Sequence, residues 1–146
     1  MDADEILAQY ADELLARYAS DELLDRYRMG ERNFVQSELS EVHLSNVNLC
    51  DINLEEANLS RAKLYGVNLS YANLNNANLS NASLYGVELH GTNLSNVDLR
   101  GADLRGANLA MAILQQADLS NANLSGADLS GADLEEANLN GAVLRG

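Results

Sequence analysis

The chain lacks proline, has a single cysteine and contains no long apolar run. Proline cannot donate a backbone hydrogen bond, so its absence indicates a fold that needs every backbone donor. Cys50 alone permits no internal disulfide, which suggests a reducing compartment or indifference to redox state. The chain starts with no charged leader and apolar stretch, and it has no run of eighteen apolar residues. We therefore expect a soluble, cytoplasmic protein without a membrane segment.

Basic residues are also scarce, with nine against 22 acidic ones, for a formal charge of −13. Residues 1–33 hold nine acidic and four basic residues, a net charge of −5, and residues 34–146 account for the remaining −8. An acidic surface disfavours direct binding to nucleic acid. Solubility is the simplest explanation of the charge.

The dominant pattern is a count of five. Leucine occupies every fifth position from Leu39 to Leu144, and Phe34 precedes the series in register. Two residues before each leucine lies a second apolar site, which from Val42 to Ala142 holds mostly alanine and valine. A period of five matches neither a helix nor a flat strand. Burying both sites requires the chain to wind about an axis and turn a corner at every unit.

Units such as Ala77–Asn81 and Ala127–Gly131 resemble the pentapeptide-repeat family, and the resemblance covers about three-quarters of the chain. The family fold is a right-handed quadrilateral β-helix, so the resemblance implies an all-β solenoid in which four units close one coil. Residues n and n+20 then stack ~4.8 Å apart, and residues 34–146 make between five and six coils, roughly 27 Å long. The expected core ladder includes Phe34, Leu64, Leu84, Leu104 and Leu124.

Residues 1–30 have a different pattern, so we divide the chain into a helical segment at 1–30 and the β-helix at 31–146. An apolar helical stripe is formed by Ile6, Leu7, Tyr10, Leu14, Leu15 and Tyr18. On one straight helix Leu24 would lie opposite Leu15, because nine residues make 900° of rotation. Either the helix breaks near Ser20 or its apolar surface covers both sides. We expect a break, because Ser20 is a good N-cap, and we expect Gly30 to end the second helix.

The second predicted helix is suited to capping the solenoid. Leu23, Leu24 and Tyr27 can cover the first coil around Phe34, whose exposed edge would otherwise favour aggregation. The Gly30–Phe34 stretch after it resembles the start of the repeat in many family members. The first predicted helix is either part of this cap or an arm that binds a partner.

Stacking by twenty places Tyr65, Tyr85 and Arg105 in one outward column, with Tyr71 around the next corner. Tyr65 and Tyr85 should stack, and Arg105 should make a cation–π contact. This column either stabilises the coil stack or forms a recognition patch, since tyrosine and arginine are common interface anchors.

A second candidate patch is the unit in which Met111 and Ile113 point outward. Exposed apolar clusters often mark interaction sites, although neutral drift of one surface unit explains it as well.

Catalytic and metal-binding patterns are missing. Cys50 and His90 share a column but lie two coils apart, about 10 Å, which is too far for a shared metal. The stacked Asp98 and Asp118 are expected to be solvated surface. We therefore predict a protein that is not an enzyme and has no cofactor or metal.

Two functions of different class remain. The first is a rigid scaffold that binds an unknown protein partner. The second is DNA mimicry, the mechanism of family members that inhibit gyrase. Such inhibitors usually carry loops that interrupt the repeat, and none does so here. B-DNA would hold about sixteen charges over ~27 Å, twice the net charge of the repeat. We also expect a homodimer through the last coil, Gly126 to Gly146, whose edge has no visible cap.

Overall fold

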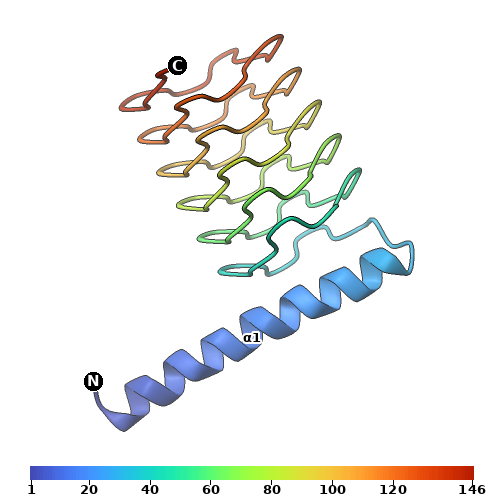
Figure 1. Cartoon of the computed structure of the whole chain (residues 1–146), viewed down its shortest axis with the longest axis vertical. Coiled ribbons are helices and arrows are strands. Elements are labelled where there is room, and N and C mark those ends of the chain that lie inside the picture. The colour runs from blue at the N-terminus through green and yellow to red at the C-terminus, as the bar shows by residue number, and fades with distance from the viewer.

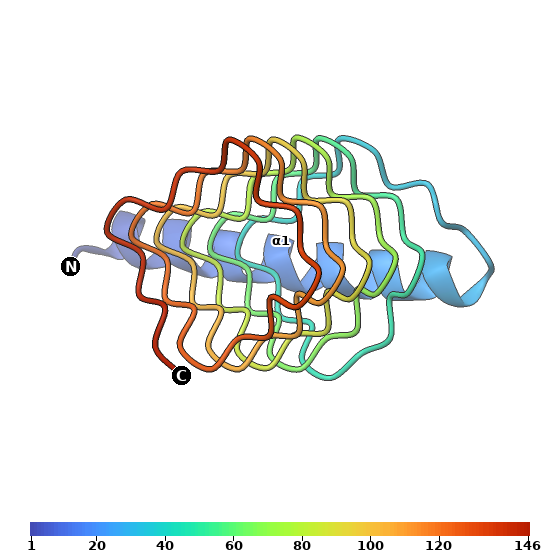
Figure 2. The same ribbon diagram turned by 90° about the horizontal axis from the view of Figure 1, so that it is seen from above.

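The computed structural model describes residues 1–146 as one helix followed by a stack of coils (Figure 1). The helix, α1 (Ala3–Arg28), is the only helix, and no extended strand follows it. From Asn33 onward the chain winds repeatedly about one axis, as the view from above shows (Figure 2). No helix has the length and apolarity that crossing a membrane requires.

The coils are joined in the predicted register. Every fifth residue from Asn33 to Asn123 forms a parallel bridge with the residue twenty positions later. Each bridge is one residue long, because the chain turns a corner before a second residue can pair. Four corners per twenty residues make a four-sided coil.

The unit Ala77–Asn81 shows how one coil is held to the next. The backbone N–H groups of Leu79 and Asn81 donate to the carbonyl oxygens of Asp98 and Arg100, at 2.7 and 2.8 Å. The same two donors recur in unit after unit. Proline at either position would remove a bond between coils, which accounts for its absence.

The same unit contains a bond to the preceding coil and a corner. Asn78 N–H donates to the carbonyl of Ala57 at 2.9 Å, and Ala77 N–H donates to the carbonyl of Leu74 at 3.0 Å across the turn. The second residue after each leucine has a positive φ, as at Asn81 (56°). A positive φ at this third turn position is the signature of a type II turn, which asparagine and glycine tolerate best.

The last N–H of the unit is bound by a side chain. Ser80 N–H donates to Oδ1 of Asn78 at 2.9 Å, and Ser120 N–H donates to Oδ1 of Asp118 at 3.0 Å. All five N–H groups of the unit 77–81 therefore have acceptors, as buried and part-buried backbone requires. This bond explains why asparagine or aspartate so often precedes the leucine.

The predicted core is confirmed. The leucines and the small residues before them form one buried cluster that extends from the helix through the coils. Exposed fractions in the predicted ladder do not exceed 3%, at Phe34, Leu64, Leu84, Leu104 and Leu124. Burial decreases in the last coil, where Leu144 is 54% exposed.

The outer edge of that last coil is unpaired. The backbone N–H groups of Leu129, Leu134 and Leu139 have no acceptor, because no further coil lies above them. The homodimer through this edge stays a prediction.

The predicted helix break is wrong, because α1 is continuous from Ala3 to Arg28. Instead of capping a second helix, the Ser20 hydroxyl donates to the carbonyl of Ala16 at 2.9 Å inside the helix. α1 begins with a capping box between Asp2 and Glu5. It ends at Arg28 with Met29 as the C-cap, and Gly30, which was predicted to stop the helix, follows with a φ of 100°.

Candidate interaction surfaces

The C-terminal third of α1 covers the base of the solenoid. Leu23 is 3% exposed, and the Tyr27 hydroxyl donates to the backbone carbonyl of Cys50 at 2.9 Å. The guanidinium of Arg32 lies 3.6 Å from the centre of the Tyr27 ring. This part of α1 is therefore the predicted cap, and Phe34 is buried beneath it.

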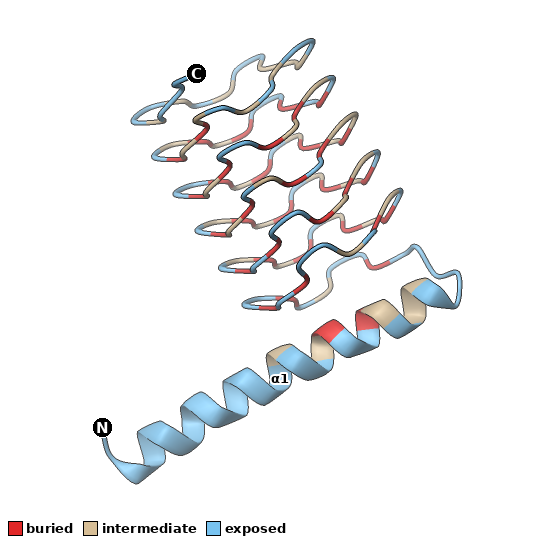
Figure 3. Ribbon diagram, viewed as in Figure 1, coloured by how far each residue is buried: buried red, intermediate tan, exposed pale blue.

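The first half of α1 diverges from the base and is solvated (Figures 1 and 3). Its large apolar side chains keep between 47% and 68% of their surface exposed. They are the six residues of the predicted stripe, which we call the outer stripe: Ile6, Leu7, Tyr10, Leu14, Leu15 and Tyr18.

The centre of the outer stripe points away from the solenoid, whereas Leu15 and Tyr18 at its margin also line a cleft between α1 and the first coils. Leu15 and Leu24 are nine residues apart on one unbroken helix, so they lie on opposite sides of it. Leu24 packs against the core, whereas Leu15 is 66% exposed. The face of the first half that turns toward the coils carries Glu13 and Ala16 instead.

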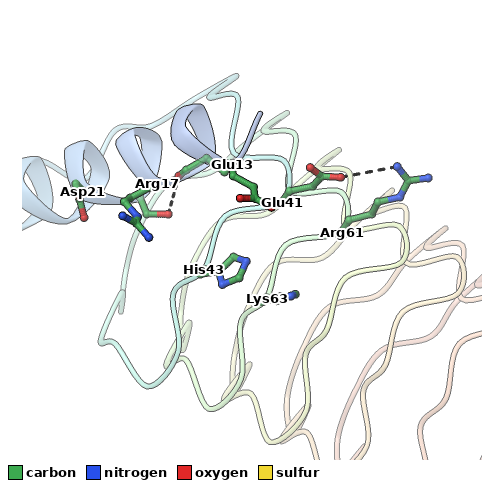
Figure 4. A pocket seen from close by; sticks show the side chains of 9 residues that line it. Glu13, Arg17, Asp21, Glu41, His43, Arg61 and Lys63 are labelled. Carbon is green, nitrogen blue, oxygen red and sulfur yellow. Dashed lines mark hydrogen bonds and ion pairs between the residues drawn. The ribbon is translucent and has the colours of Figure 1, made fainter. Parts of the chain in front are cut away.

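A polar cleft of about 610 Å³ lies between α1 and the first coils (Figure 4). Both charge signs line it, and its one ion pair joins Arg61 to Glu41 at 4.0 Å. Exposed pairs of this kind contribute little to stability. The other charged or titratable residues of the cleft are Glu13, Arg17, Asp21, His43 and Lys63.

No pattern in the sequence pointed to this cleft as a whole. Its coil residues stack at intervals of twenty, Glu41 with Arg61 and His43 with Lys63, and the repeat predicts this stacking. Its other wall depends on the direction that α1 takes below the coils, which the repeat does not indicate.

The aromatic column is partly as predicted. Arg105 lies 5.5 Å from the centre of the Tyr85 ring, and its guanidinium also forms two 2.8 Å bonds with the Asp103 carboxylate. The bond from Arg105 holds the pKa of Asp103 below its usual value, because it favours the charged carboxylate. Tyr65 and Tyr85 are 40% and 54% exposed.

The predicted stacking of Tyr65 on Tyr85 is wrong. The ring pair that does form joins Tyr71 to His90, edge to face, with centroids 5.5 Å apart. Tyr71 lies around a corner from the column and is 60% exposed. The column therefore has one fixed member, Arg105, rather than a continuous aromatic stack.

The second candidate patch is exposed but isolated. Met111 is 59% exposed and Ile113 is 40% exposed. The Met111 sulfur lies against Gly131 of the next coil, so part of its side chain contributes to packing between coils.

No three histidine, cysteine, aspartate or glutamate side chains come together in a way that could hold a metal ion. The free thiol of Cys50 is half-buried beside the cap. His90, which shares its column, contacts Tyr71 instead.

The twenty-residue register, the corners of positive φ and the helical cap define a four-sided β-helical solenoid with exposed side chains on its walls. The chain belongs to the pentapeptide-repeat family: the model for pentapeptide repeats matches residues 37–70, 62–101 and 102–141 with 8 copies. Members of this family form right-handed quadrilateral β-helices and are generally structural proteins rather than enzymes.

Several solved structures of cyanobacterial proteins are similar. The pentapeptide repeat protein Rfr23 from Cyanothece 51142 is 30% identical, with a TM-score of 0.79, over 83% of this chain and 96% of that one. The protein alr5209 from Nostoc PCC 7120 is 31% identical over 86% and 94%, with a TM-score of 0.27. HetL, from Nostoc sp. strain PCC 7120 and involved in heterocyst differentiation regulation, is 27% identical over 85% and 96%, with a TM-score of 0.33. No curated protein is significantly similar to the chain.

Proposed function

We propose that the chain is a non-enzymatic cytoplasmic scaffold that binds a protein partner through the column of Tyr65, Tyr85 and Arg105. The observation that carries this proposal is the fixed position of Arg105 between the Asp103 carboxylate and the Tyr85 ring. Arginine and tyrosine are the side chains that most often anchor protein interfaces. A guanidinium that is already held in place loses less conformational entropy when a partner binds.

The solenoid supports this role by its rigidity. A rod of between five and six coils, bonded at every unit, presents its wall side chains at a constant spacing of about 4.8 Å. Tyr71 lies on the adjoining side, and its contact with His90 supports its orientation in the same way. Met111 and Ile113 offer the partner a further apolar contact on the wall.

The test is affinity capture from the native organism with the full chain and with the Tyr65→Ala/Tyr85→Ala/Arg105→Ala variant. We expect a specific partner to bind the wild-type chain and to be lost with the variant. A Ser45→Ala/Ser125→Ala variant is the matched control, because these serines occupy the same column. If the same partners remain on the triple variant, the column is not the binding surface.

DNA mimicry is the second candidate, and the net charge of −13 favours it. The structure supplies an argument against it, because Arg100 and Arg105 form close ion pairs with Asp98 and Asp103 on the wall. Carboxylates that are neutralised in this way do not imitate a row of phosphates. A gyrase supercoiling assay decides the question: absence of inhibition at micromolar protein removes mimicry.

A further inference from the structure

The outer stripe of α1 has no partner within the chain. Leu7, Tyr10 and Leu14 lie at its centre, on the side of α1 that faces away from the solenoid. The other three residues of the stripe, Ile6, Leu15 and Tyr18, lie at its margins, and the whole stripe is roughly 23 Å long from Ala3 to Tyr18. Each of the six side chains exposes on the order of 100 Å², so together they present about 600 Å² of surface. A standard interface buries about 800 Å² on each partner. Small alanines within the stripe leave room for close approach of a second helix.

The spacing of the stripe is self-complementary when two copies run antiparallel. With a two-fold axis between Tyr10 and Ala11, each residue of one copy lies level with the residue of the other copy for which the two residue numbers add up to 21. Large side chains then face small ones or match in size. The facing pairs are Leu7 with Leu14, Tyr10 with Ala11, and Ala3 with Tyr18, while Ile6 and Leu15 share a level at opposite margins of the stripe.

Helix dipoles also favour the antiparallel arrangement, because antiparallel packing opposes the dipoles of the two α1 helices.

We propose that the outer stripe binds a second copy of this chain, with the two α1 helices antiparallel and the two solenoids pointing away from each other. A two-fold arrangement uses the same surface on both copies, which is what a self-complementary stripe provides. The solenoid does not obstruct it, because the coils lie on the other side of α1 (Figures 1 and 3). The Tyr85 column stays free, so this dimer and the proposed scaffold function are independent.

The first test is sedimentation equilibrium of the full chain from sub-micromolar to tens of micromolar. We expect a monomer–dimer equilibrium that the Leu7→Glu/Leu14→Glu variant weakens by roughly 100-fold or more, since it brings charges into an apolar seam. Both leucines are exposed, so the solenoid should stay folded. Gln9→Glu is the control, because it adds a charge on the opposite side of the same helix and should leave the equilibrium unchanged.

The second test fixes the direction of the helices. In a Cys50→Ser background, Leu7→Cys and Leu14→Cys chains are mixed and oxidised. We expect the mixture to form disulfide-linked dimers far faster than either variant alone, because position 7 faces position 14 of the other copy.

Three results would overturn the proposal. They are a monomer at tens of micromolar, a dimer that the Leu7→Glu/Leu14→Glu variant leaves intact, and preferential self-linking of Leu7→Cys. A dimer that is lost in Leu144→Arg but kept in the double glutamate variant would belong to the last coil instead. None of these results bears on partner capture by the Tyr85 column.

Discussion

The ring of Tyr71 lies directly over Gly91, the residue twenty positions later in the next coil. A Cβ added to Gly91 would lie 2.7 Å from Cε1 of Tyr71, closer than real Cβ contacts allow. Gly91 also has a positive φ of 65°. Glycine is therefore suited to this corner for two separate reasons, its backbone conformation and the space for a ring.

Gly91→Ala and Gly106→Ala separate these two reasons. Gly106 has a φ of 66°, but no atom lies within 4 Å of the place that a Cβ would take there. Its substitution should therefore cost only the backbone strain, about 1–2 kcal/mol. Gly91→Ala should cost a further ~1–3 kcal/mol, because the Tyr71 ring must move. Urea unfolding of both variants measures the difference.

The control is the same pair of substitutions in a Tyr71→Ala background. There the excess cost of Gly91→Ala should disappear. Equal losses at Gly91 and Gly106 in the native background would show that Tyr71 yields without cost.

Asn78→Ala tests the side-chain bond that completes the backbone of each unit. Removing Oδ1 leaves the N–H of Ser80 without its 2.9 Å acceptor, so we expect a loss of ~1 kcal/mol in the free energy of unfolding. Asn78→Asp keeps the oxygen and should lose much less. Ser83→Ala is the matched control, since Ser83 occupies the same place in its unit and accepts no such bond. A loss at Ser83 equal to that at Asn78 would contradict the assignment.

The period of five was enough to predict the core and the twenty-residue register, because only winding buries two positions of every five. The role of Asn78 and its equivalents was not predictable in the same way. It depends on which N–H remains unpaired after the bonds between coils form, and periodicity does not contain that information. The exposed fractions of Tyr65 and Tyr85 follow from the column, but the ring orientation that joins Tyr71 to His90 does not.

In α1, the local sequence preference at Ser20 predicted the wrong structure. Ser20 is suited to start a helix, yet the same hydroxyl can bond to a carbonyl four residues earlier and stay inside one. Packing of Leu23 and Tyr27 on the base decides between these conformations, and local propensity does not. The alternative with apolar residues on both sides of one helix is the one observed.

Leu84→Asp should abolish folding or cost more than ~3 kcal/mol, because Leu84 is fully buried and nothing near it can pair a charge. Leu144→Asp is the matched control, since that side chain is 54% exposed and its substitution should change the free energy of unfolding by less than about 1 kcal/mol. Circular dichroism during urea unfolding measures both. A stable Leu84→Asp chain with a cooperative transition would contradict the β-helix assignment.

Low pH should lower the stability that the ion pairs of Asp98 and Asp103 contribute. Hydrogen bonds from Arg100 and Arg105 lower the pKa of these carboxyls from the ordinary value of 3.8. A lowered pKa in the folded state means that the contribution is present above the unfolded pKa and is lost as the pH falls through the folded one. We therefore expect stability to fall below about pH 4, and the Arg100→Gln/Arg105→Gln variant to show a shallower fall. Parallel stability–pH curves for the two chains below about pH 4 would contradict this origin.

Leu23→Ala and Leu14→Ala test the division of α1 into a capping part and a free part. Leu23 is 3% exposed against the first coil, so its truncation should cost ~2–4 kcal/mol through lost burial and a cavity at the base. Leu14 lies on the same helix but is 58% exposed on the outer stripe, and Leu14→Ala should stay within about 0.5 kcal/mol. Both are measured by urea unfolding at sub-micromolar protein, where self-association through the outer stripe does not contribute. If Leu14→Ala destabilises the monomer as much as Leu23→Ala does, the first half of α1 packs on the solenoid in solution and is not free to bind.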